Sequence, residues 1–395
     1  MNGTWPRPLP RAGLRARAAT LGTFALPSLL LGACVGLTAC GGSGPIRIGM
    51  QGTYGDPLGR PQRFGAELAV KQINDAGGIN GRLLELVEAD DKGDPDSAVT
   101  AALTLANSDV VAVVGGSFSG PTLAAAPVYN DPANPVVQIT PSGSNPDITY
   151  AGEWTFRVCP SDLSHAAALA RFVRQTLRLD RGVIFYMNNG YGRGFRDAFE
   201  TEFVRLGGTV LRADPYIPEQ VKDAAPFVDR VAIDPRAQFI LAASYVDDGA
   251  ELLRMARARG VTLPFLGGDG LEGIERQGAV AEGTYQTAAY LANLATTANT
   301  QWVAQYHAAF PQEPPPNQTA VATYDAVNLL AKLIADVGTD RTALRNALAQ
   351  VGTARPAYEG ISGRIAFDSL GDVPEKRVLI AQARGGVSRA VEGAQ

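Results

Sequence analysis

Six polar side chains stand just after short apolar runs of the chain, where a ligand could be bound. They are Ser119, Ser142, Ser144, Tyr191, Tyr245 and Asp269. The serines offer hydroxyls and their loops offer backbone N–H groups, which suit a carboxylate. One acid and two phenols suit an ammonium group. Taken singly, each serine or tyrosine is more often a turn or packing residue, but the set predicts a site for a zwitterionic amino acid.

The residues that catalysis would need are scarce. His165 and His307 are the only histidines, and neither belongs to a cluster with metal or nucleophile spacing, so both are expected on helix surfaces. The segment 115–120 (GGSFSG) comes close to a nucleophile elbow, but G-x-S-x-G fails around Ser117 and around Ser119. A hydrolase is therefore disfavoured, and no catalytic residue is predicted.

Motifs for cofactors and metals also fail on inspection. The segment 190–195 (GYGRGF) has Phe195 where a dinucleotide-binding fingerprint needs its third glycine. The acidic run that begins at Asp90 has Ala101 at the twelfth position, where a calcium loop needs a chelating side chain, so this run is expected to be a loop and helix cap. Asn317-Gln318-Thr319 matches a glycosylation sequon and is interpreted as incidental. No cofactor and no metal are predicted.

The start of the chain has the composition of a signal peptide. Residues 1–19 contain four arginines and no acidic residue, and the apolar stretch 21–37 that follows is interrupted by Pro27. A membrane-spanning helix needs about 20 apolar residues, so a permanent anchor is the weaker alternative. We expect residues 1–39 to be a lipoprotein signal peptide that is removed.

Cys40 is the candidate for lipid attachment. Leu37-Thr38-Ala39-Cys40 resembles a bacterial lipobox, in which cleavage precedes the cysteine and the thiol takes a lipid; Cys34 is a poorer second candidate. The alternative is that Cys40 is simply a small residue after an ordinary signal. Glycines and a serine follow it, so residues 40–45 are expected to form a tether between a membrane and a folded body.

Length and charge limit the remaining function classes. The chain has 395 residues, enough for two domains of ordinary size. It carries 35 Lys and Arg against 39 Asp and Glu, and loss of residues 1–39 moves the net charge from -4 to -8. An acidic body makes nucleic acid an unsuitable partner.

Short apolar runs alternate with amphipathic stretches along the rest of the chain. The expected strands are 46–50, 83–88, 110–114 and 136–139, followed by 183–186, 209–211, 239–242 and 265–266. The expected helices include 66–73, 98–105, 165–177, 191–206 and 248–259. This alternation is typical of parallel sheets, and its two rounds predict two similar α/β lobes. Such sheets bind ligands at the carboxyl ends of their strands.

From residue 46 to about 381, the chain resembles the branched-chain amino acid binding proteins of bacterial ABC transporters, which have the type I periplasmic binding protein fold. The segments that carry the resemblance are 65–70 (GAELAV), 73–81 (INDAGGING), 90–95 (DDKGDP), 156–157 (FR), Asp162, 191–192 (YG) and 265–270 (FLGGDG). The resemblance implies two doubly wound Rossmann-like lobes joined by a three-stranded hinge. Such a protein closes over its ligand as a flytrap.

The resemblance also implies roles for the six candidates. Ser119 would place its hydroxyl on the ligand carboxylate, and Ser142 would use a backbone group. Ser144 replaces the family's usual threonine and keeps its hydroxyl.

In the second lobe, Tyr191 and Tyr245 match the family's tyrosines, and Asp269 matches the acid that pairs with the ligand ammonium. Asp269 is one methylene shorter than the glutamate of the best-known members. Leu58 lies where some members have an aromatic residue, so ligand specificity does not transfer.

In the family, the chain crosses between the lobes three times, which would place crossings near Ser161, Leu291 and Phe367. We therefore expect lobe 1 at 46–161 plus 291–366 and lobe 2 at 162–290 plus 367–395.

The resulting hypothesis is an extracytoplasmic lipoprotein, anchored to the membrane by its lipid, that delivers an amino acid to an ABC permease and catalyses no reaction. The alternative is a ligand-sensing receptor domain for amides or small carboxylates.

Overall fold

A computed structural model describes residues 44–218 and 220–393. The expected signal peptide at 1–39, the lipidation site Cys40 and all but the last two residues of the expected tether lie outside the described residues.

The first sheet has five parallel strands in the order β2-β1-β3-β4-β5. They are β1 (Ile46–Gly52), β2 (Leu84–Asp90), β3 (Ala112–Val114), β4 (Val137–Thr140) and β5 (Thr155–Arg157). Helices α1 (Pro61–Asp75) and α9 (Gln318–Val337) pack on one face, and α2 (Pro95–Ala106) and α3 (Ser119–Tyr129) pack on the other. Every residue of β3 is buried, as a parallel sheet with two covered faces requires. We call this sheet and its helices lobe 1.

The second sheet has seven strands in the order β14-β13-β10-β9-β8-β6-β7. They are β6 (Arg181–Met187), β7 (Thr209–Tyr216), β8 (Phe239–Ala243), β9 (Phe265–Gly267), β10 (Tyr285–Ala288), β13 (Leu379–Arg384) and β14 (Val387–Ala390). The pairs from β10 to β7 are parallel, whereas β13 and β14 are antiparallel. Helices α4 (Asp162–Arg171) and α5 (Gly190–Arg205) cover one face, and α6 (Ala225–Ala232) and α7 (Val246–Ala258) cover the other. We call this sheet and its helices lobe 2, and the two together confirm the predicted doubly wound α/β class.

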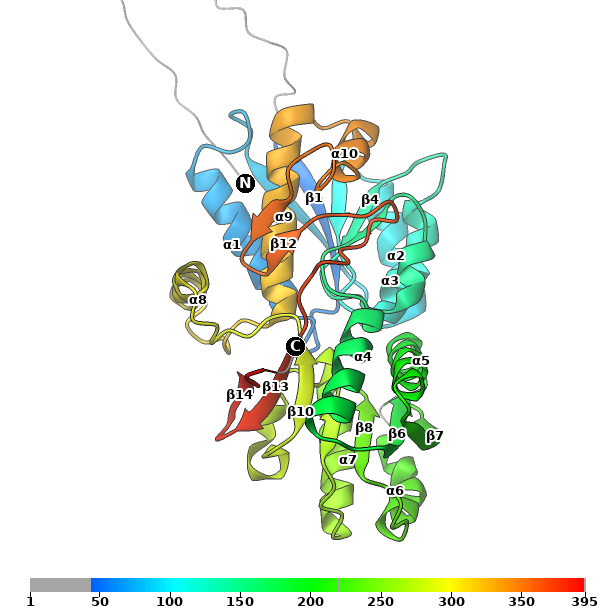
Figure 1. The fold of residues 1–395 in the computed structure, drawn as a ribbon. Helices are drawn as coiled ribbons and strands as arrows, with labels where there is room; N and C mark the ends of the chain where they lie inside the picture. Colours follow the sequence, from blue (N-terminus) through cyan, green and yellow to red (C-terminus); the bar gives the residue numbers. More distant parts are fainter. Residues whose placement is uncertain (1–43, 219, 394–395) are drawn as a thin grey trace, which may run out of the picture. The chain divides into compact units, whose positions relative to one another are not determined.

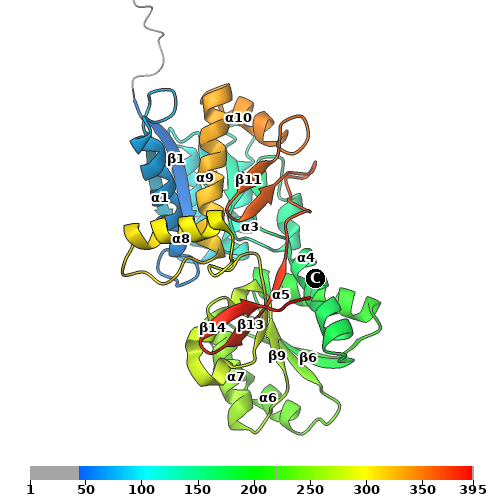
Figure 2. The same cartoon turned by 60° about the vertical axis from the view of Figure 1, so that its left-hand side comes forward.

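Late segments of the chain return to both lobes. Helices α8 (Thr297–Ala309), α9 and α10 (Arg341–Leu348) follow the parallel strands of lobe 2 in the sequence, yet α9 packs along α1 in lobe 1 (Figure 1). The hairpin β11 (Tyr358–Gly360) and β12 (Gly363–Ile365) comes next. Strands β13 and β14, drawn in red in Figure 2, then complete the sheet of lobe 2. Each lobe is therefore built from separated stretches of sequence.

Local sequence explains where several elements begin. Helix α2 starts at Pro95, and the carboxylate of Asp94 accepts a hydrogen bond from the Ser97 N–H at 2.8 Å, so the acidic run is a loop and helix cap as predicted. After α1, Gly77 and Gly78 adopt positive φ angles of 100° and 75°, which favour glycine.

One expectation about helix surfaces is wrong. His165 lies on α4 but is completely buried, and its Nδ1 is 2.9 Å from the hydroxyl of Thr287. The apolar residues of α4 face the sheet, and His165 lies on the same side of the helix. The residue type alone does not predict this buried position. His307 lies on α8 and is partly exposed.

No helix within 44–218 and 220–393 is both long and apolar enough to cross a membrane.

Candidate functional site

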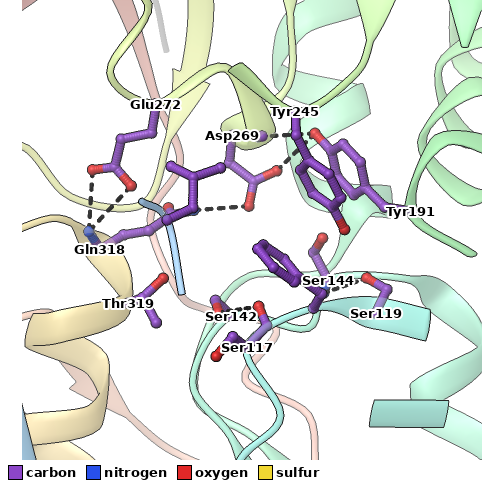
Figure 3. A pocket seen from close by; sticks show the side chains of 13 residues that line it. Ser117, Ser119, Ser142, Ser144, Tyr191, Tyr245, Asp269, Glu272, Gln318 and Thr319 are labelled. Carbon is purple, nitrogen blue, oxygen red and sulfur yellow. Dashed lines mark hydrogen bonds between the residues drawn. The ribbon is translucent and has the colours of Figure 1, made fainter. Parts of the chain in front are cut away.

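A narrow pocket is lined by residues from both lobes (Figure 3). Its lining residues are Leu58, Ser117, Phe118, Ser119, Ser142, Ser144, Tyr191, Tyr245, Asp269, Gly270, Glu272, Gln318 and Thr319. All six candidates from the sequence are among them.

Ser119 is the first residue of α3, and its Oγ joins two loops of lobe 1. This oxygen accepts hydrogen bonds from the N–H groups of Ser144 at 3.3 Å and Asn145 at 3.2 Å. With its acceptor side occupied, the hydroxyl keeps its own proton to donate to a ligand oxygen. The first N–H groups of α3 add donors at the same place, because a helix N-terminus leaves them without partners in the helix.

A hydrogen-bond network holds the strand ends beneath these serines. The Ser117 hydroxyl donates to Gln62 Oε1 and accepts from the Thr53 N–H at 3.2 Å. Ser142 donates its hydroxyl to the Ser117 carbonyl at 2.7 Å. Both hydroxyls are therefore committed to the protein, and the backbone of the Ser142 loop remains as the group that can meet a ligand.

Arg157, at the end of β5, holds the backbone of the loop that contains Ser144. Its guanidinium is buried and donates to the carbonyls of Ser144 at 3.0 Å and Asn145 at 2.9 Å. The same group forms a two-pronged pair with Asp372 at 2.9 and 2.6 Å. The serine loops are thus held mainly by lobe 1, and the Asn145 side chain adds a hydrogen bond to the Gly190 carbonyl of lobe 2.

The wall from lobe 2 carries one carboxylate and two phenols. The Tyr191 hydroxyl donates to Asp269 Oδ1 at 3.1 Å and accepts from the Gly270 N–H at 3.0 Å. The ring of Tyr245 stacks on Tyr191, with centroids 5.0 Å apart and planes at 11°, and lies 4.6 Å from the ring of Phe118 in lobe 1. Tyr191 therefore orients Asp269, while Tyr245 carries an aromatic contact across to the other lobe.

Gln318, the first residue of α9, joins lobe 1 to two carboxylates of lobe 2. Its side-chain Nε2 donates to Asp269 Oδ2 at 3.0 Å. Its backbone N–H donates to both oxygens of Glu272, at 3.1 and 3.2 Å. A single lobe-1 residue thus contacts both acids that line the pocket.

Burial changes the proton affinity of the groups around Asp269. It raises the pKa of Glu272 to about 8, and the hydrogen bond from the Gln318 backbone only partly offsets this effect. Burial, with the nearby charge of Asp269, also raises the pKa of Asp162, whereas burial lowers the pKa of His165. The His165 Nε2 lies 3.8 Å from Asp269 Oδ2. The lobe-2 side of the pocket is therefore acidic, and no lysine or arginine is among the lining residues.

The sequence did not single out Glu272, Gln318 or Thr319 as ligand-binding residues. Gln318 and Thr319 belong to the sequon considered above, but Asn317 is the N-cap of α9 and its side chain accepts a hydrogen bond from the Ala320 N–H at 2.9 Å. An asparagine after a run of prolines and before an apolar segment marks a helix start, and the polar residues that follow it are the signal that could have found the pair.

The family model described as periplasmic binding protein matches residues 45–387. The chain belongs to this family. This periplasmic binding protein is similar to the Leu/Ile/Val-binding protein homolog 3 of Brucella melitensis biotype 1. The two chains are 31% identical over 278 residues, which cover 69% of this chain and 71% of that one.

Solved structures give the same result for the fold. A substrate-binding protein of an ABC transporter from Desulfitobacterium hafniense, in complex with Leu, is 28% identical with a TM-score of 0.74, covering 88% of this chain and 100% of that one. A solute binding protein of an ABC transporter from R. palustris, in complex with benzoate, has a TM-score of 0.75 at 20% identity, covering 88% of this chain and 96% of that one. The second likeness shows the fold alone. The relatives are solute-binding proteins, and the predicted fold family is confirmed.

Proposed function

We propose that this periplasmic binding protein is the solute-binding component of an ABC importer and binds an amino acid between its two lobes. The observation that carries the proposal is the division of the pocket: hydroxyls and N–H groups come from lobe 1, and Asp269 with two phenols comes from lobe 2. The first set suits a carboxylate and the second suits an ammonium group. The relatives whose names include leucine, isoleucine and valine support an amino-acid ligand.

Binding proceeds in two steps in this proposal. The ligand docks first on the serine loops, because most of their hydrogen bonds come from lobe 1, and Tyr191, Tyr245 and Asp269 then close over it by hinge motion. We propose crossings near Ser161 and Leu291. We place the third between Val373 and Leu379 instead of at Phe367, because Phe367 and Val373 pack in the core of lobe 1.

We also propose where in the cell the protein acts. The protein acts outside the cytoplasm, tethered to the membrane through a lipid on Cys40, and delivers its ligand to a permease in the same membrane. Mass spectrometry of the protein purified from bacterial membranes tests the tether: a diacylglycerol on Cys40 is expected, and a chain that begins at another residue would contradict it.

A thermal-shift screen of the purified protein against the amino acids, short amides and aromatic acids tests the ligand. A ligand at 100 times its dissociation constant stabilises a protein by about 2.7 kcal/mol. Stabilisation by amino acids supports the proposal. Stabilisation only by ligands without an amine would remove the role of Asp269 and favour a receptor or importer for amides or small carboxylates.

A further inference from the structure

The pocket has one more carboxylate than an aliphatic amino acid needs. Asp269 is the partner for an α-ammonium group, but Glu272 also lines the pocket, and no lysine or arginine lines it. Gln318 donates a hydrogen bond to each acid, one from its backbone and one from its side chain, so the two carboxylates lie close together. The pocket is therefore complementary to a ligand with two positive charges and one negative charge.

Glu272 lies apart from the groups that would hold the amino-acid head. Figure 3 shows Glu272, Gln318 and Thr319 on the side of the pocket away from Tyr191 and Tyr245. A ligand whose ammonium group meets Asp269 and whose carboxylate meets the serine loops would direct its side chain toward this side.

The side chains on this side of the pocket are polar, and the hydroxyl of one of them makes no hydrogen bond within the described residues. Thr319 is only 4% exposed, its hydroxyl has no hydrogen bond within the described residues, and Figure 3 shows that hydroxyl turned toward the cavity. This hydroxyl can therefore donate a hydrogen bond to a ligand or accept one from it. An aliphatic side chain would leave the Thr319 hydroxyl without a polar contact and would bring no positive charge to Glu272, whose oxygens accept hydrogen bonds from the Gln318 backbone N–H.

The protein only partly compensates the charge of Glu272. Its hydrogen-bond partner is the backbone N–H of Gln318, at the positive end of α9. Arg276 lines the neighbouring clefts together with Glu272 but does not line this pocket. Burial raises the pKa of Glu272, and a cation placed beside the carboxylate would lower that pKa again.

We infer that the pocket selects an amino acid whose side chain ends in an ammonium group, of the lysine or ornithine kind, over leucine, isoleucine and valine. Glu272 is the residue that determines this preference, and Thr319 adds a hydrogen-bond acceptor. The inference rests on the proposed function, because it places the amino-acid head between the serine loops and Asp269.

Titration calorimetry on the purified full-length protein tests the inference with matched ligands. L-Lysine and L-norleucine share the same straight side chain up to Cε, and only lysine carries the terminal amine. We expect lysine, or ornithine against norvaline, to bind at least tenfold more tightly than its neutral match. Neutral amino acids binding as tightly as basic ones would overturn the inference and leave the proposed function intact, whereas no binding of any amino acid would remove both.

Variants separate a ligand contact from a purely structural role. Glu272→Gln keeps an acceptor for the Gln318 N–H but removes the charge, and it is expected to reduce the lysine-to-norleucine preference to less than threefold. Glu275→Gln removes a charge three residues away, outside the lining of this pocket, and should leave the preference unchanged.

An equal loss of affinity for lysine and norleucine in Glu272→Gln would show that Glu272 only ties the lobes together, and would overturn the inference. Thr319→Val provides a second test that does not depend on the folding of the first variant. It should weaken lysine binding about threefold to fivefold and should not weaken norleucine binding; an unchanged lysine affinity would contradict the role of Thr319.

Discussion

The two walls of the pocket are built on different principles. The wall from lobe 1 is made of neutral groups that are held by their own lobe: Ser119 by two backbone N–H groups and the serine loops by Arg157. The wall from lobe 2 carries the buried Asp269 and the partly buried Glu272, and both take hydrogen bonds from Gln318 of the opposite lobe. Lobe 1 is therefore largely a preformed docking surface, whereas Asp269 accepts hydrogen bonds from both lobes and Glu272 accepts its hydrogen bonds from the opposite lobe. Four predictions test this difference.

The largest effect is expected at Asp269. Replacing it with alanine leaves the ligand ammonium buried without its counter-charge, which costs on the order of 3 to 5 kcal/mol. We therefore expect Asp269→Ala to lose detectable amino-acid binding in calorimetry. The control is the thermal unfolding of the ligand-free variant, which should remain cooperative. Affinity retained within tenfold would mean that Asp269 is structural or that the ligand has no amine.

Glu272 is expected to make the stability of the ligand-free protein depend on pH. Burial raises its pKa in the folded state to about 8, so the folded state holds a proton that the unfolded state has already released. Stability contributed by this proton is complete below the pKa of an ordinary glutamate, about 4.3, and is lost as pH rises through 8.

Chemical denaturation at pH 5 and pH 8.5 measures this loss. Relative to Glu272→Gln, which cannot titrate, the native chain should lose about 2 to 4 kcal/mol of unfolding free energy over this range. The variant Glu275→Gln removes one of the charges that raise the pKa of Glu272, so it should reduce the pH dependence without abolishing it. Identical pH dependence in the native chain and Glu272→Gln would show that the carboxylate is well solvated.

Ser119→Ala tests the preformed wall. The change removes the donor to the ligand carboxylate and leaves the N–H groups of Ser144 and Asn145 without their acceptor, at a cost of about 1 to 3 kcal/mol. We expect an affinity loss of about tenfold to one-hundredfold. Ser142→Ala is the matched control, since its hydroxyl binds the Ser117 carbonyl; a smaller loss is expected there. Equal losses would mean that both serines act only by holding the loops.

The smallest effect is expected at the contact between the walls. Gln318→Leu removes the bond to Asp269 but keeps the backbone N–H that Glu272 accepts, and one hydrogen bond to a charged group contributes about 1.5 kcal/mol. Affinity should fall about fivefold to tenfold, and small-angle scattering should show a larger radius of gyration without ligand. An unchanged radius would show that this bond does not hold the ligand-free lobes together.

Several elements could be predicted from local sequence alone. The apolar run at 46–50 and the proline and acid before 98–105 gave β1 and α2, because strand patterning and helix capping act over a few residues. β10 and β13 were not predicted, since each is short and is defined by pairing with strands far away in the sequence. His165 was misplaced for a related reason: which side of α4 faces the sheet depends on the packing of the whole lobe.

The sequence by itself determined the α/β class, the family and the six candidate residues, all of which line one pocket. The α/β class follows from periodicity, the six residues follow from their positions after predicted strands, and the family follows from the resemblance of short motifs to known proteins. Only the tertiary structure brought Gln318 and Thr319 to Asp269 and Glu272, 46 or more residues earlier in the chain. That meeting depends on α9 returning to lobe 1 and placing its N-terminus against lobe 2, and no local pattern encodes where a returning helix ends. Only this contact between α9 and lobe 2 identifies Glu272 as the second carboxylate of the pocket.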